Sequence, residues 1–329
     1  QDLVGQSLLL PSLNNQLRHA KVAEITRHLK GGTYRIMAET RAHTFKGVSR
    51  LKSPTAHLIK FSNEQKRDVL ERLQPGDMIF TYTAGYMSDV FIPGAFKHGI
   101  TYVGSLEERS EAGLTAESIE RMRDDMPKEE VAKLLQQFKI STVAVTPSTT
   151  RSTKGEKMQT DLPEEENTPD ANIIEAVAEG VIFNNLFRIM DTHVNRLLIL
   201  RPRITFEERT DALISIFRYL GDDYDFGFNF ADVSAVVCTE IQYHAFQGKG
   251  QLSFELTKRA GHPTLSADDI ANYYLAKPAS FDFVLLALED MNSSQHDAKV
   301  YVGDDGKDAL IDLMNGEVHD DDDETDRFN

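Results

Sequence analysis

Short apolar runs alternate with amphipathic segments along the chain, which indicates a fold of mixed strands and helices. Apolar and β-branched runs predict strands at 78–83, 99–103, 173–177, 197–200 and 281–288, and a further apolar run spans 233–237. Apolar spacing and composition predict helices at 17–29, 63–73, 128–138, 206–220, 239–247 and 268–275. Residues 105–139 as a whole have helical composition, and the sequence contains no internal repeat.

Two segments interrupt this pattern. Residues 147–169 are rich in Ser, Thr, Lys, Glu and Pro and contain almost no large apolar residue. Such a segment cannot bury enough surface to offset its ordering entropy, so it is predicted to be a mobile loop. The end of the chain after Val318 carries the acidic run Asp320 to Glu324, and it is predicted to be a disordered, solvated tail.

Composition excludes several classes of protein. Of the 329 residues, 40% are hydrophobic and 27% are charged, which is close to the average for globular proteins. No apolar run reaches the roughly 18 residues of a membrane-spanning helix, so no integral membrane segment is expected. The net charge is −16, which repels phosphate backbones, so nucleic acid is not an expected partner. No charged-then-apolar leader follows Gln1, so the sequence does not fix the location and secretion stays open. A periplasmic or secreted location is favoured over a cytoplasmic one.

The chain has one cysteine, Cys238, which excludes an intrachain disulfide and a zinc site built on several thiolates. Cys238 follows the apolar run 233–237 and opens a predicted helix. Unpaired N–H groups and the helix dipole at that position lower the pKa of a thiol and can stabilise an oxyanion. The alternative is a buried, unreactive core cysteine. Glu240 and Asp232 have structural explanations, as a first-turn carboxylate and a turn residue.

A nucleophilic cysteine needs a base, and the chain has ten histidines. His98 is the best placed, since it lies at the start of the strand 99–103 after a glycine-containing loop. A third group must orient the imidazole, and Glu175 is the lone charged residue in the strand 173–177. The alternatives are a surface histidine at a strand edge and a solvent-facing carboxylate.

These residues lie in an ordered set of motifs that resembles the circularly permuted NlpC/P60 cysteine hydrolases of the YiiX/YebB-like type. That family shows Pro-Gly-Asp before an apolar strand, then a His-x-Gly-Ile-like strand, and later Tyr-Asp-Phe before Cys-Ser-Glu. The corresponding segments here are Pro75 to Phe80, Lys97 to Gly104, Ile173 to Ala176, Tyr224 to Phe226, Asp232, Cys238 to Glu240 and Leu265 to Ile270. The order of histidine, acid and cysteine is the permuted one.

The resemblance implies a papain-like α+β fold, with a small antiparallel sheet packed on helices. By position, it implies that Cys238 is the nucleophile, His98 the base and later the acid, and Glu175 the orienting group. It implies no cofactor and no metal. Thr239 stands where the family usually has serine.

The resemblance also predicts the organisation of the chain. Residues 61–315 are expected to form the catalytic domain, and residues 105–170 form an insertion where the family usually has a short connection. Residues 1–60 are expected to be a partly helical N-terminal extension, and residues 316–329 the acidic tail.

The function expected from these residues is a cysteine hydrolase of amide or ester bonds. The expected substrate is the peptide part of peptidoglycan, cleaved by an amidase or endopeptidase reaction. One alternative is a hydrolase or acyltransferase acting on fatty-acyl amides or esters. The expected partner is a peptidoglycan peptide under the first function and an acyl-containing small molecule under this alternative. The other alternative is a non-catalytic lipid- or peptide-binding module on the same fold.

Overall fold

The computed structural model describes residues 58–83, 94–141, 170–177, 179–224, 235–259 and 262–316. The helix predicted at 17–29, the loop predicted at 147–169 and the tail after Val318 lie outside these residues, as does Asp232. The division into an extension, a catalytic domain and a tail therefore stays a prediction.

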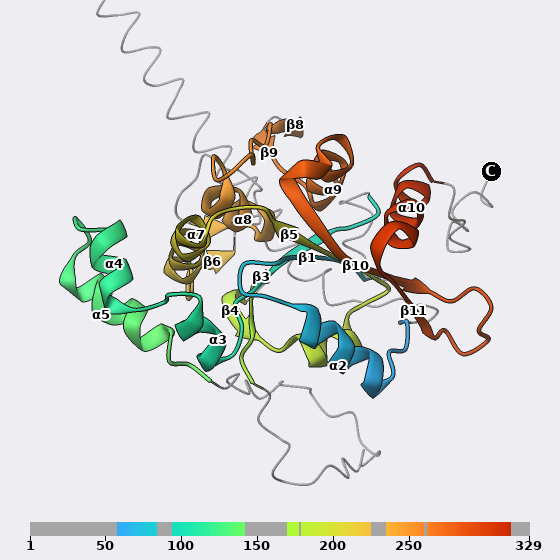
Figure 1. Cartoon of the computed structure of the whole chain (residues 1–329), viewed down its shortest axis with the longest axis horizontal. Helices are drawn as coiled ribbons and strands as arrows, with labels where there is room; N and C mark the ends of the chain where they lie inside the picture. Colours follow the sequence, from blue (N-terminus) through green and yellow to red (C-terminus); the bar gives the residue numbers. More distant parts are fainter. Residues whose placement is uncertain are drawn as a thin grey trace, which may run out of the picture.

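A seven-stranded antiparallel sheet forms the centre of the described part (Figure 1), in the order β11-β10-β5-β1-β2-β3-β4. Its strands are β1 (Met78–Tyr82), β2 (His98–Tyr102), β3 (Ile173–Val177), β4 (Gly180–Asn184), β5 (Arg196–Pro202), β10 (Phe281–Glu289) and β11 (Ala298–Tyr301). Two short pairs lie outside it: β6 (Asp223–Tyr224) with β7 (Ala235–Val236), and β8 (Thr257–Arg259) with β9 (His262–Thr264). The antiparallel α+β architecture is confirmed, although the sheet has more strands than the sequence predicted.

Helices cover both faces of the sheet (Figure 1). On one face lie α7 (Phe206–Arg218), α8 (Cys238–Phe246), α9 (Ala267–Ala276) and α10 (Gly303–Met314), and on the other lie α2 (Asn63–Arg72) and α6 (Leu186–Thr192). At one side lie α3 (Leu106–Glu111), α4 (Ala116–Met122) and α5 (Lys128–Gln137), and a 3-10 turn at Pro278–Ser280 precedes β10. No helix of the described residues is long and apolar enough to cross a membrane.

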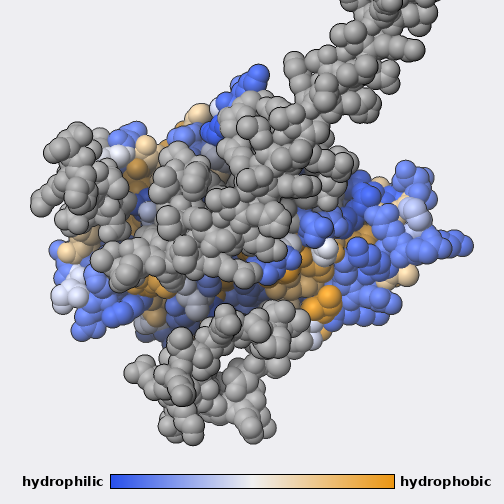
Figure 2. Space-filling model, turned by 180° about the vertical axis from the view of Figure 1, so that it is seen from behind, coloured by the Kyte–Doolittle hydropathy of each residue, from blue (hydrophilic) through white to orange (hydrophobic). Residues whose placement is uncertain are grey.

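The central strands are apolar on both sides because each face of the sheet is buried. In β1, Met78, Ile79 and Phe80 are all fully buried. Met78 and Phe80 belong to the core beneath α7–α9, while Ile79 belongs to the core beneath α2 and α6. A strand buried on two faces appears in the sequence as a continuous apolar run, which explains why β1 was predicted. Seen from behind, the described surface is hydrophilic at both sides, with apolar residues between them (Figure 2).

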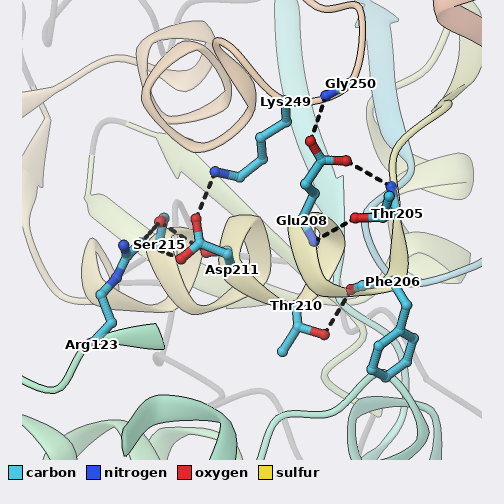
Figure 3. Close-up of polar contacts among 9 residues, drawn as sticks. All are labelled: Arg123, Thr205, Phe206, Glu208, Thr210, Asp211, Ser215, Lys249 and Gly250. Carbon is cyan, nitrogen blue, oxygen red and sulfur yellow. Dashed lines mark hydrogen bonds and ion pairs between the residues drawn. The ribbon is translucent and has the colours of Figure 1, made fainter. Parts of the chain in front are cut away.

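Hydrogen bonds and ion pairs connect α7 to the turn that follows α8 (Figure 3). The Glu208 carboxylate accepts the Gly250 N–H at 2.8 Å, and Lys249 pairs with Asp211 at 2.6 Å. Arg123, which follows α4, also pairs with Asp211, at 2.8 Å. These bonds fix the C-terminal end of α8 against α7, and so help to set where the N-terminal end of α8 lies.

A buried arginine holds the described ends of the predicted insertion together. Arg109 is 1% exposed and donates to the carbonyls of Phe138, Ile140 and Ala171. Burial lowers the pKa of Arg109 to about 10, since its hydrogen-bond acceptors are carbonyl groups and not carboxylates. The Ala171 N–H also donates to the Ser141 carbonyl at 2.9 Å. The chain therefore leaves and re-enters the described fold at adjacent positions on either side of residues 142–169.

Candidate active site

Cys238 is the first residue of α8, directly after the short strand β7 and Val237. The Glu240 carboxylate accepts the Val237 N–H at 3.1 Å, so Glu240 caps the helix, in agreement with the structural role predicted for it. The Cys238 sulfur lies near the backbone N–H groups of Thr239 and Gly99, which lower the pKa of the thiol. The thiol therefore lies where the helix dipole and two N–H donors stabilise negative charge.

Gly99 allows α8 to lie directly against β2. A Cβ atom on Gly99 would lie 2.7 Å from Gln242 Oε1 and 3.2 Å from Thr239 Cγ2. The Gln242 side-chain amide donates to the Ile100 carbonyl at 2.9 Å, and the Thr239 hydroxyl donates to the Leu265 carbonyl at 2.6 Å. These contacts fix the distance between the start of α8 and β2.

His98 is the first residue of β2 and pairs with Thr81 of β1. Its Nε2–H donates to Glu175 Oε2 at 2.8 Å, and the Cys238 sulfur is close enough to raise the pKa of the ring. Because Nε2 is used by Glu175, Nδ1 is the nitrogen left to face the sulfur. The imidazole is 27% exposed, so a substrate can reach it from solvent.

The loop before His98 is held by a half-buried carboxylate on α9. Asp268 accepts the N–H groups of Ala95 and Phe96 at 2.9 and 2.8 Å. Gly94 has a φ of 140°, and a side chain there would collide with the Asp268 carboxylate. The conformation of the chain just before His98 therefore depends on Gly94 and on the two hydrogen bonds from the main chain to Asp268.

Glu175 lies on β3, next to β2, and is 4% exposed. Its Oε2 accepts from His98, and its Oε1 accepts from the Asn184 side-chain amide at 2.6 Å. Both oxygens of this buried carboxylate are therefore hydrogen-bonded, as a buried charge requires.

The three ionisable groups stabilise one another's charges. Burial opposes charge on the His98 ring, but the adjacent Cys238 sulfur and the Glu175 carboxylate raise the pKa of His98 to about 10. Burial also opposes the thiolate and the carboxylate, but His98 lowers the pKa of Cys238 and of Glu175. This arrangement favours the charged forms of all three groups: a thiolate, an imidazolium and a carboxylate in a row. A thiolate of this kind can attack a carbonyl carbon.

The structure thus brings together Cys238, His98 and Glu175, which are far apart in the sequence. His244, the histidine of α8, is 3.5 Å from Glu240 and stacks on Tyr219. Among the described residues, no group of three or more His, Cys, Asp or Glu side chains could hold a metal ion.

Sequence reasoning missed three residues that support this site: Asn184, Gln242 and Asp268. Asp268 lies in a segment that matched the motif set, but nothing in the sequence gave it a partner. Gln242 lies four residues after Cys238, so the two residues share one face of the predicted helix. This spacing is the signal that could have placed Gln242 near the site. Asn184 carried no such signal, because its contact depends on how β4 pairs with β3.

A cleft of about 560 Å³ lies elsewhere, and its lining contains none of these residues. It lies by the turn before β1, whereas His98 pairs with Thr81 near the other end of that strand. Two of its arginines already have carboxylate partners, since Arg201 pairs with Asp77 and Arg203 with Asp282. The cleft is therefore separate from the cysteine.

Comparison with known proteins identifies the family. A search of curated proteins gave no match. One solved structure is similar, the metalloprotein YiiX from Escherichia coli O157:H7, with 14% sequence identity and a TM-score of 0.33. That comparison covers 71% of this chain and 98% of the YiiX chain. The profile of the permuted papain-like amidases, the YaeF/YiiX or C92 family, matches residues 72–281. This match spans more than half of the sequence and confirms the resemblance drawn from the motifs, so the chain belongs to the family of permuted papain-like amidases.

Proposed function

We propose that this protein is a cysteine amidase in which Cys238 is the nucleophile, His98 the base and later the acid, and Glu175 the residue that orients His98. The observation that carries the proposal is that Cys238, His98 and Glu175 are adjacent: His98 donates to Glu175 at 2.8 Å, and His98 and Cys238 are close enough to shift each other's pKa. The family's description as amidases supports an amide substrate over an ester. A module that only binds a ligand has no need of a thiolate paired with an imidazolium.

In the reaction, the Cys238 thiolate attacks the carbonyl carbon, and the carbonyl π electrons move to the oxygen. N–H groups in the first turn of α8 donate to this oxyanion. As the tetrahedral intermediate collapses, the C–N bond breaks and the His98 imidazolium gives its proton to the leaving amine. The acyl group is then held as a thioester on Cys238.

The second half of the reaction returns the enzyme to its first state. Neutral His98 takes a proton from a water molecule, whose oxygen attacks the thioester carbon. The C–S bond then breaks, the carboxylic acid leaves, and the thiolate and the imidazolium are restored. Throughout, Glu175 holds the Nε2–H tautomer and compensates the positive charge of the ring.

For the substrate we propose an amide bond in the peptide part of peptidoglycan. The test is to incubate the protein with soluble peptidoglycan fragments and, separately, with fatty-acyl amides and esters, and to follow the new amine or acid by mass spectrometry. Cleavage of the peptide fragments alone supports the proposed substrate. Cleavage of the acyl compounds alone contradicts it and favours the lipid-directed alternative.

Variants separate enzyme from binding module. Cys238→Ala is expected to abolish turnover, and His98→Ala is expected to lower it by about 10²–10⁴-fold, the usual effect of losing a general base. His244→Ala is the matched control, because this histidine lies on α8 but contacts Glu240. Turnover that survives Cys238→Ala would contradict the proposal.

A further inference from the structure

Asn184 lies at the end of β4 and contacts the carboxylate that orients His98. Its side-chain amide donates to Glu175 Oε1 at 2.6 Å, while His98 donates to Glu175 Oε2 at 2.8 Å. The two bonds therefore use opposite oxygens of a carboxylate that is 4% exposed.

The direction of the Asn184 amide is fixed by a second contact. Its Oδ1 accepts the Asn185 backbone N–H at 2.8 Å. A backbone N–H can only donate, so Oδ1 must face it and the NH₂ group must face Glu175. The amide of Asn184 is thus held in the one orientation that donates to the carboxylate.

We infer that Asn184 is a fourth member of the site, a positioning residue that keeps Glu175 ionised and in the rotamer that holds His98. The inference rests on the proposed function, since it assigns Asn184 a role in the same Cys–His–Glu arrangement. The bond favours the charged form of Glu175, which in turn favours the imidazolium and the thiolate. Without it, one oxygen of a buried carboxylate lacks a donor, and the carboxylate can rotate away from His98.

Asn185 provides a matched control because it is the next residue and has the same side chain. Asn185 is 7% exposed, and its amide contacts the Asp170 carbonyl at 2.7 Å and caps α6 through the Arg188 N–H at 2.9 Å. No contact joins its side chain to Glu175 among the hydrogen bonds of the described residues. Asn185→Ala is expected to lower the urea midpoint of unfolding through the lost helix cap, without changing the chemistry of Cys238.

The experiment measures the rate of alkylation of Cys238 by iodoacetamide from pH 5 to 10 in the full chain. Cys238 is the only cysteine, so the modified mass reports this site alone. Asn184→Ala is expected to shift the acid side of the alkylation profile to higher pH by about one unit, so that at a given pH on that side the rate falls by about tenfold, the effect of a rise of one unit in the thiol pKa. Asn185→Ala is expected to keep the wild-type profile although it unfolds more easily. A merely structural role for Asn184 predicts equal profiles for the two variants.

A second pair of variants keeps the test valid if truncation prevents folding. Asn184→Asp keeps the acceptor for the Asn185 N–H but brings two carboxylates together, which raises one of their pKa values. The alkylation profile of Asn184→Asp is therefore expected to gain a further ionisation step, and that of Asn185→Asp is not.

The arms of the experiment distinguish the inference from the function on which it rests. If His98→Ala slows alkylation at pH 6 and neither Asn184 variant changes the profile, the role of Asn184 is wrong and the proposed function stands. If His98→Ala leaves alkylation unchanged, the proposed function itself is wrong, and the role of Asn184 falls with it.

Discussion

The contact between α8 and β2 can be tested by adding one methyl group at Gly99. In Gly99→Ala the new Cβ would lie 2.7 Å from Gln242 Oε1 and 3.2 Å from Thr239 Cγ2. Close C···O contacts in proteins are about 3.3–3.6 Å long, so the gap to Gln242 falls short by roughly 0.6–0.9 Å. Gln242 is 1% exposed and bonded to the Ile100 carbonyl, so it cannot rotate away without losing that bond. The start of α8 must therefore move away from β2.

That movement separates groups that the proposed chemistry needs in contact. Overpacking of a buried contact costs about 1–3 kcal/mol of stability. A misplacement of about 1 Å at a reacting group can lower turnover by about 10²-fold. The Cys238 sulfur also moves away from the Gly99 N–H and from His98, both of which lower its pKa. The thiol pKa is expected to rise toward the ordinary value of about 8.5, at which the thiolate fraction at pH 6 is on the order of 0.3%.

The assay for Gly99→Ala is the alkylation rate of Cys238 at pH 6, together with the free energy of unfolding in urea. Gly306→Ala is the matched control, because a Cβ there would collide with the Phe283 ring under α10, far from Cys238 in the sequence. That control is expected to lose stability and keep the wild-type alkylation rate. Adding Gln242→Ala to Gly99→Ala removes the closest clash and is expected to restore part of the rate. If Gly99→Ala alkylates like the wild type at pH 6, the steric argument is refuted.

Three further predictions concern the charges of the site and the ends of the insertion. Alkylation of Cys238 is expected to stay fast from pH 6 to 9, because the pKa of His98 is raised to about 10 and the imidazolium loses its proton only as the pH rises through that value; a single transition near pH 8.5 would contradict this. Arg109→Met is expected to lower the free energy of unfolding by at least about 1–3 kcal/mol, since it leaves buried carbonyls without a donor, whereas an unchanged urea midpoint would show that they find other donors. Replacing residues 142–169 with a short Gly-Ser linker is expected to leave a folded protein with a similar urea midpoint, because the flanking residues are hydrogen-bonded to each other; loss of cooperative unfolding would show that the segment carries part of the fold.

Sequence patterns predicted the central strands and the long helices because burial there is strong and continuous. The strand predicted at 281–288 corresponds to β10, and the helix predicted at 206–220 corresponds to α7. α7 buries one face against the sheet core, which produces the apolar spacing visible in the sequence.

Apart from the shortest strands, the elements missed were β4, α6, β11 and α10, and each lacks a clear boundary or a clear apolar pattern in the sequence. In the stretch 181–190, β4 runs into α6 without a proline or glycine, and only Asn184 and Asn185 separate their apolar residues. Asn185 is the N-cap of α6, which is a signal that could have divided the stretch. β11 is a short edge strand, and α10 begins with Gly303-Asp304-Asp305-Gly306, a poor start for a helix by intrinsic propensity.

In the candidate site, some residues can be predicted from the local sequence pattern and others depend on the strand register. Cys238, His98 and Glu175 could be proposed from the sequence because each begins or interrupts a predicted element, and their motifs follow in the permuted order. The contact of Asn184 with Glu175 follows instead from the pairing of β3 with β4, in which Glu175 lies opposite Ile182 and Asn184 lies opposite Ile173. A shift of one residue in this pairing would turn Asn184 to the other face of the sheet. A lone carboxylate in an apolar strand therefore indicates, from the sequence alone, a buried charge that needs hydrogen-bond partners. Which neighbouring residue is the partner depends on the strand register.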